Sequence, residues 1–330
     1  MADLSTTYLG IQLKNPIIIG SCDLTASIDN IVNLEKNGAG AIVLKSIFEE
    51  EILLEADDKL KKAKENKLIY SQLSETLDYI DVHLKEKRVG KYLQLIKEAK
   101  GKTLIPIIAS INCITDSEWT DYAIRIQEAG ADALELNISL HPNELEETEF
   151  EKTLLKIIMK VSSKVSIPIS IKISNSFTNL ARTIIELSNT GIAGLVMFNR
   201  FYSPDIDITN LTISSENILS SPNEYQNSLR WIGLMSEKVN CNLAASTGIH
   251  NGNIIIKQLL AGADAVQLVS AIKINGFEYL TQLIDEIEKW MQEQNFSSIQ
   301  QFKGKLSYKN AMNPAAYERM QFMKYYSKIN

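Results

Sequence analysis

The stretch Ala261-Gly262-Ala263-Asp264-Ala265-Val266-Gln267-Leu268 joins a helix end to an apolar run, and this arrangement occurs four times. The other copies are Asn37-Gly38-Ala39-Gly40-Ala41-Ile42-Val43-Leu44, Ala129-Gly130-Ala131-Asp132-Ala133-Leu134-Glu135-Leu136 and Thr190-Gly191-Ile192-Ala193-Gly194-Leu195-Val196-Met197. In each copy the glycine can end a helix in the left-handed conformation, and the small residues allow a tight turn. The apolar run suits a buried parallel strand. The repeat therefore predicts an α/β protein with a parallel sheet.

Further strands can be placed around this repeat. We expect eight, at about 15–20, 41–45, 104–109, 133–137, 168–173, 194–198, 242–247 and 265–269. Amphipathic stretches such as Ser117–Ala129 and Phe277–Gln292 follow most of them, and Pro106 and Pro168 suit strand starts. A strand and a helix repeated eight times predict a (β/α)8 TIM barrel. A doubly wound sheet is the alternative, but no GxGxxG fingerprint follows the first strand.

The barrel accounts for residues 1–330 as a single domain. A polar, aromatic-rich tail, about 296–330, is expected to pack on the barrel or on a partner subunit. The connections at about 46–90 and 199–226 are long. Long loops at the carboxyl ends of barrel strands usually shape the active site, with surface elaboration as the alternative.

Composition excludes several classes of protein. The 330 residues are 45% hydrophobic and 22% charged, as in soluble globular domains. A net charge of −6 without basic runs argues against nucleic-acid or membrane binding, and no apolar stretch reaches the ~20 residues of a membrane span. The three cysteines are far apart without CxxC, and the three histidines lie on separate segments. We therefore expect a cytoplasmic protein without a disulfide framework, signal peptide or metal site.

Polar residues gather where the expected strands end, which is where barrels hold their ligands. They are Lys45-Ser46, Ser110-Ile111-Asn112, Glu135-Leu136-Asn137-Ile138-Ser139, Lys172, Asn199-Arg200, Ser246-Thr247-Gly248 and Ser270-Ala271. Lys45 and Lys172 adjoin apolar runs, where a buried lysine needs an anionic partner. The pair indicates a bound anion, or one lysine caps a neighbouring carboxylate. The small hydroxyl residues after the last two strands suit a phosphate, although Ser-Thr-Gly is also an ordinary turn.

At these residues the chain resembles a known family, the class 1 dihydroorotate dehydrogenases. The resemblance rests on Asn15-Pro16, Ala41-Ile42-Val43-Leu44-Lys45-Ser46, Glu135-Leu136-Asn137-Ile138-Ser139, Ile169-Ser170-Ile171-Lys172, the block from Ser246-Thr247-Gly248 to Leu268, and Gln301-Phe302-Lys303-Gly304-Lys305-Leu306. Val196-Met197-Phe198-Asn199-Arg200-Phe201-Tyr202 with Pro204-Asp205-Ile206-Asp207 is similar to a branch labelled dihydroorotate dehydrogenase-like.

The resemblance implies an FMN enzyme in which hydride passes from a dihydropyrimidine to the flavin while a base removes the neighbouring proton. It implies FMN binding by Ser21, Lys45, Ser46, Asn137, Lys172, Thr247, Gly248, Ser270 and Ala271. It implies substrate binding by Asn137, Asn143, Asn199 and Arg200. Lys45 would lie near both flavin and substrate, and the charge of Lys172 would stabilise reduced flavin. Arg200 is an anion ligand or an ion-pair partner of Asp205 or Asp207.

Three segments depart from the family pattern. The family's base loop is Asn-x-Ser-Cys-Pro-Asn, whereas this chain has Asn137-Ile138-Ser139-Leu140-His141-Pro142-Asn143. His141 could replace the cysteine as base near pH 7, or the chain has lost its base. In Leu73-Ser74-Glu75-Thr76-Leu77-Asp78-Tyr79, the two acids would repel a substrate carboxylate. Ser220-Ser221-Pro222-Asn223-Glu224 replaces a glycine-rich turn.

The leading hypothesis is therefore an FMN-dependent oxidoreductase that converts dihydroorotate to orotate in pyrimidine biosynthesis, with an altered base loop. Alternatives are oxidation of another dihydropyrimidine or C–C bond, a flavin-binding scaffold without a base, and a non-redox phosphate-binding barrel like an aldolase or isomerase. In the last case Lys172 would form a Schiff base. The partner is a small-molecule substrate, and the electron acceptor is open between fumarate, a quinone and a protein. The family implies a homodimer.

Overall fold

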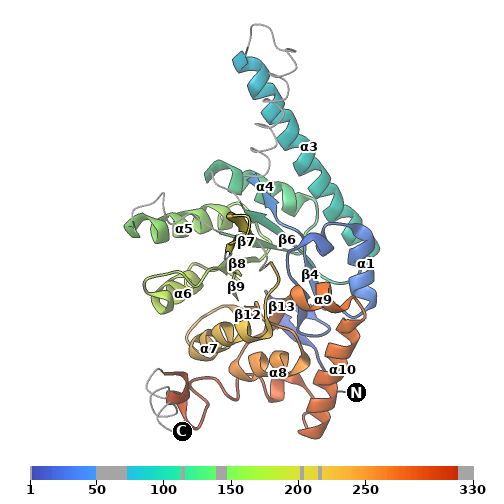
Figure 1. The fold of residues 1–330 in the computed structure, drawn as a ribbon, viewed down its shortest axis with the longest axis vertical. Helices are drawn as coiled ribbons and strands as arrows, with labels where there is room; N and C mark the ends of the chain where they lie inside the picture. The colour runs from blue at the N-terminus through green and yellow to red at the C-terminus, as the bar shows by residue number, and fades with distance from the viewer. Residues whose placement is uncertain are drawn as a thin grey trace.

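Eight parallel strands close into a barrel surrounded by helices in this computed structural model (Figure 1). The structure describes residues 2–49, 73–112, 116–138, 147–200, 204–214 and 218–318. The barrel strands are β3 (Ile17–Ile19), β4 (Ala41–Val43), β6 (Ile107–Asn112), β7 (Ala133–Asn137), β8 (Ile169–Ile173), β9 (Gly194–Met197), β12 (Asn242–Ser246) and β13 (Ala265–Leu268). Pairing of β4 with β6 completes the circle, and β5 (Ile47–Phe48) extends along β6. The predicted TIM barrel is confirmed.

The helices lie around the outside of the barrel (Figure 1). They are α1 (Ile28–Lys36), α3 (Leu73–Lys102), α4 (Asp116–Glu128), α5 (Glu147–Ser162), α6 (Leu180–Ser188), α7 (Tyr225–Met235), α8 (Gly252–Ala261), α9 (Ser270–Asn275) and α10 (Tyr279–Glu293). The glycines of the four repeats, Gly38, Gly130, Gly191 and Gly262, have φ between 87° and 115°. Because L side chains avoid this region, glycine allows each helix to stop and the chain to enter the next strand.

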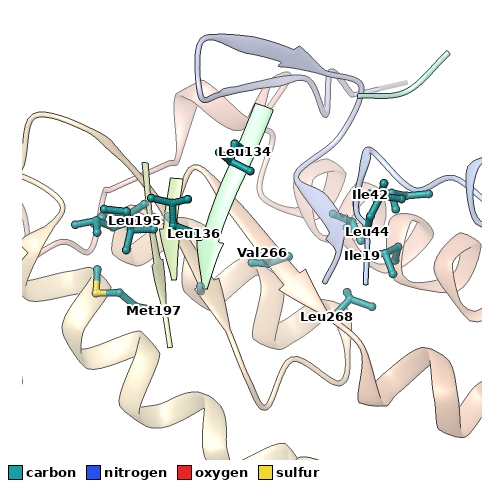
Figure 2. Close-up of a cluster of buried hydrophobic side chains, with 14 of the residues drawn as sticks. Ile19, Ile42, Leu44, Leu134, Leu136, Leu195, Met197, Val266 and Leu268 are labelled. Carbon is teal, nitrogen blue, oxygen red and sulfur yellow. The ribbon is translucent and has the colours of Figure 1, made fainter. Parts of the chain in front are cut away.

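Side chains alternate between the two faces of each strand, and in this barrel both faces are buried. The outer faces pack against the helices and include Ile19, Ile42, Leu44, Leu134, Leu136, Leu195, Met197, Val266 and Leu268 (Figure 2). The inner faces carry Ile18, Val43, Ile108 and Val196, and the hairpin of β1 (Thr6–Tyr8) and β2 (Ile11–Leu13) adds Tyr8, Leu9 and Leu13 to the same apolar cluster. Polar residues replace apolar ones further along the inner faces of β6, β7, β8 and β13.

The strand predictions agree with the structure within a few residues, and the third strand shows the largest shift. It begins at Ile107 rather than near Leu104, which is fully exposed. Glu35 accepts hydrogen bonds from the N–H groups of Leu104 and Ile105 instead. Pro106 and Pro168 precede their strands and offer only carbonyl oxygens, to Ile42 N–H and Leu134 N–H. The start of a strand accepts proline, because no N–H group is needed there for pairing.

The long connection predicted at 46–90 is partly wrong. Helix α3 already begins at Leu73, so Glu75 and Asp78 belong to helical backbone rather than to a loop. The second half of α3 packs on the barrel through buried Val89, Ile96 and Ala99, whereas its first half projects away from the barrel (Figure 1). The connection after β9 contains a hairpin of β10 (Asp205–Asp207) and β11 (Thr212–Ser214).

The chain after α10 runs back over the barrel's outer helices. Phe296 and Phe302 cluster with Trp290 at ring distances of 5.0–5.7 Å. Gly304 N–H and Leu306 N–H donate to carbonyl oxygens of α8, and Tyr308 N–H donates to Gly233 of α7. Within the described residues, no helix has the length and apolar character needed to cross a bilayer.

Candidate active site

A cavity of about 390 Å³ opens at the carboxyl ends of the barrel strands. Its walls include Ser21, Lys172, Asn199, Arg200, Thr247, Gly248 and Ser270, which the sequence analysis assigned to cofactor or substrate. Ser46, Asn137 and Ala271 adjoin these residues through hydrogen bonds or the chain itself. Ligand cavities of about 300–1,000 Å³ at this end of a barrel are the usual active sites.

A chain of serine hydroxyls crosses the ends of three strands. Ser21 Oγ lies 3.0 Å from Ser46 Oγ and accepts a 2.8 Å hydrogen bond from Ser46 N–H. Ser46 Oγ lies 2.7 Å from Ser110 Oγ, and both of these side chains are buried. The chain ties β3, β4 and β6 together and leaves Ser21 on the cavity wall.

Two asparagines form a fixed amide pair. Asn199 Nδ2 donates to Asn137 Oδ1 at 2.6 Å, joining the ends of β7 and β9. This hydrogen bond does not use Asn137 Nδ2, a donor, or Asn199 Oδ1, an acceptor. Such a pair can recognise a flat ring that carries alternating N–H and C=O groups.

Lys172 enters the cavity from the inner face of β8 and is half-buried. Its Nζ donates to Gln267 Oε1 at 3.1 Å, and Gln267 Nε2 donates to Glu135 Oε2 at 2.6 Å. Burial raises the pKa of the Glu135 carboxyl, and the positive charge of Lys172 partly opposes this. No role was predicted for Glu135 and Gln267 from the sequence. The signal was present: both are polar residues inside apolar strands, on the alternating positions that face inward.

The turn after β12 has an unusual backbone. Thr247 and Gly248 both have left-handed φ, 73° and 75°. A Cβ on Gly248 would overlap the backbone N of Tyr225 and lie 2.7 Å from the carbonyl carbon of Glu224. Thr247 Oγ1 donates to Phe198 O at 3.0 Å. The turn is therefore pressed against the start of α7 with room only for glycine.

Segment 218–224 joins this turn to the start of α9. Ser220 N–H donates to Ser270 Oγ at 2.9 Å, and Ser220 Oγ lies 3.1 Å from His250 Nε2. Burial lowers the pKa of His250. The loops after β12 and β13 and a short extra helix form the place where many barrels hold phosphate.

Two expectations about charged residues need correction. Lys45 follows the end of β4 and is exposed, so the expectation that it is buried is wrong. Arg200 pairs with Glu224 at 3.3 Å and donates to Ile218 O at 2.9 Å. Asp207 instead accepts hydrogen bonds within its own turn, from Thr209 and Asn210.

His141 and Asn143 lie outside the described residues, so the base hypothesis stays a prediction. The same is true of Ser139 to Pro142 around them. Among the described residues, no group of three or more His, Cys, Asp or Glu side chains could hold a metal ion.

The chain matches a known protein family. A family model described as dihydroorotate dehydrogenase matches residues 3–291. The catalytic subunit of dihydroorotate dehydrogenase B (NAD(+)) from Thermoplasma volcanium is 26% identical over 92% of this chain and 98% of its own length. The corresponding subunit from Pyrococcus abyssi is 24% identical, over 91% and 98%. Chloroplastic dihydropyrimidine dehydrogenase (NADP(+)) from Arabidopsis thaliana is 21% identical, over 92% and 76%.

Proposed function

Because the chain belongs to the dihydroorotate dehydrogenase family, we propose that it is an FMN-dependent enzyme that oxidises dihydroorotate to orotate in pyrimidine biosynthesis. Its family and relatives make it an oxidoreductase that acts on a CH–CH bond. The observation that carries the finer proposal is the convergence of three groups on one cavity. These are the Lys172 ammonium, the Asn137–Asn199 amide pair and the turn at Thr247.

The chemistry of these groups fits FMN. Lys172 supplies a positive charge that stabilises negative charge on the reduced ring. Ser21, Lys45, Ser46 and the two asparagines offer hydrogen bonds to its polar edge, and the turns at Thr247-Gly248 and Ser270-Ala271 suit its phosphate. When bound, FMN accepts the hydride.

The substrate would lie against the amides of Asn137, Asn143 and Asn199. His141 would remove the proton next to the leaving hydride, since a neutral imidazole is a competent base near pH 7. Arg200 lines the cavity and contacts Glu224 and Ile218, and its guanidinium has further N–H donors that would bind an anionic substrate.

A second candidate substrate is a dihydropyrimidine without a carboxylate, or another activated C–C bond. Two observations favour it. The base loop differs from the family pattern at Leu140 and His141, and the Arabidopsis relative is by name a dihydropyrimidine dehydrogenase.

An anaerobic visible spectrum of the purified protein tests the proposal. We expect an oxidised-flavin band that bleaches on addition of dihydroorotate. Dihydrouracil, which lacks the carboxylate, is the matched substrate, and bleaching by it alone would support the second candidate. A protein that neither carries nor binds FMN would refute the proposed function. Lys172→Met is the variant to compare with the wild type. It should lower the affinity of the protein for reduced FMN relative to oxidised FMN.

We also propose how electrons leave and how the chain assembles. The archaeal relatives are by name catalytic subunits of NAD(+) enzymes, which supports a protein partner as acceptor over fumarate or a quinone. Reoxidation of the reduced protein by each acceptor distinguishes them.

A homodimer should give a solution mass of twice 37.0 kDa.

A further inference from the structure

Three inward-facing residues from three strands form one hydrogen-bonded chain, of which Lys172 and Gln267 line the cavity. Lys172 on β8, Gln267 on β13 and Glu135 on β7 are linked by hydrogen bonds of 3.1 and 2.6 Å. Glu135 lies two residues before Asn137, whose register partner on β8 is Lys172. Glu135 therefore belongs to the layer beneath the one that meets the ligand.

The donor and acceptor chemistry of this chain permits one arrangement. A lysine ammonium only donates hydrogen bonds and an ionised carboxylate only accepts them. Gln267 has one donor group and one acceptor oxygen, so both neighbours are satisfied only when its oxygen faces Lys172 and its nitrogen faces Glu135. The ammonium and the carboxylate thus require the same orientation of the amide, and the hydrogen bond to Glu135 holds the amide in its place.

Burial of the Glu135 carboxyl does not by itself stabilise the fold. The side chain is 1% exposed, and its Oε1 has no hydrogen-bond partner among the described residues. The hydroxyls of Ser170, its register partner on β8, and of Tyr8 are also buried. A buried polar atom without a partner, such as Glu135 Oε1, costs about 1–3 kcal/mol. Well-packed apolar side chains are often at least as stable as buried charges, which indicates another role for the carboxylate.

We propose that Glu135 and Gln267 are positioning residues that hold the Lys172 ammonium at the cavity wall. Glu135 fixes the Gln267 amide, and the amide oxygen fixes Lys172 Nζ. The charge of Lys172 is then presented to the bound ring from one place. The effect on the cofactor rests on the proposed function; the effect on Lys172 is visible in the protein alone.

The experiment is a double-mutant cycle of Glu135→Met, which removes the hydrogen-bond acceptor, and Lys172→Met, with Ser170→Ala as the control in the same layer. The reduction potential of bound FMN reports the affinity for reduced over oxidised cofactor. We expect Glu135→Met to lower this ratio at least tenfold, about 30 mV for two electrons. The change should vanish when Lys172 is already Met. Gln267→Met, which changes no charge, should act in the same direction, and Ser170→Ala should change the ratio less than twofold.

The cycle separates positioning from a direct effect of charge. Removing a nearby negative charge would by itself favour reduced cofactor, and this would persist in the Lys172→Met background. That result, or an unchanged potential in Glu135→Met, would overturn the proposal. Thermal unfolding should place the midpoint of Glu135→Met at or above that of the wild type. A large decrease would indicate a merely structural role.

A crystal structure of Glu135→Met decides the same question without FMN. We expect Lys172 Nζ to leave Gln267 Oε1, and an unchanged contact would overturn the proposal while leaving the proposed function intact. A wild type that retains this contact but binds no FMN would overturn the proposed function, and with it the effect on the cofactor.

Discussion

Replacement of Gly248 by alanine should destabilise the fold and weaken the proposed cofactor site together. Two effects add at this position. Gly248 has φ of 75°, a conformation that costs an L residue about 1–2 kcal/mol. A Cβ would also lie 2.7 Å from Glu224 C and overlap Tyr225 N, where ordinary contacts begin at 3.4 Å. The turn and the start of α7 must therefore separate by about 1 Å, which adds roughly 1–3 kcal/mol of overpacking.

Gly191 offers a matched control. Its φ is 87°, but nothing lies within 4 Å of the position of an added Cβ. Gly191→Ala should therefore cost only the backbone term of about 1–2 kcal/mol, a fall of a few degrees in the unfolding midpoint. Gly248→Ala should cost about 2–5 kcal/mol in total.

The assay pairs thermal unfolding with FMN affinity, measured by flavin fluorescence. Because the displaced turn is the proposed phosphate site, FMN affinity should fall at least tenfold in Gly248→Ala, or about 1.4 kcal/mol. It should be unchanged in Gly191→Ala. Equal unfolding midpoints and equal FMN affinities for the two variants would refute the reasoning.

Further predictions concern His141, His250 and Lys172. His141→Ala should lower kcat about 10²–10⁴-fold, because it removes the proposed base; an unchanged rate would instead support the alternative that the chain has lost its base. Burial lowers the pKa of His250 in the folded state below its unfolded value, so the unfolded state binds more protons in acid. The stability that neutral His250 contributes is therefore present above about pH 6.5 and is lost as pH falls through the folded pKa. The unfolding midpoint of His250→Gln should fall less than that of the wild type between about pH 7.5 and 5.5. Identical unfolding curves would contradict this prediction. Borohydride with candidate carbonyl substrates should leave no adduct on Lys172, and an adduct there would favour the aldolase-like alternative.

Local sequence patterns were sufficient for the barrel. Each repeat places a glycine at a left-handed position and an apolar run after it, and both signals act within about eight residues. Helix α3 was harder to predict. Its first half projects away from the barrel (Figure 1), and a single apolar stripe does not run along its whole length.

The site could be predicted as a set of strand ends but not as a set of contacts. Lys45 shows the limit, because β4 ends at Val43 and the lysine emerges at the exposed rim. Arg200 shows another. Its ion-pair partner is Glu224, 24 residues away, rather than the nearby acids of the β10–β11 hairpin.

The sequence by itself determined the fold class, the strand ends that meet at one rim and the residue types available there. These follow from local propensity and from alternation, which act over a few residues. Only the tertiary structure decided that Glu135, Lys172 and Gln267 form one chain, because closure of the barrel brings together residues 95 and 132 positions apart. A one-residue change of register would turn each of these side chains to the other face.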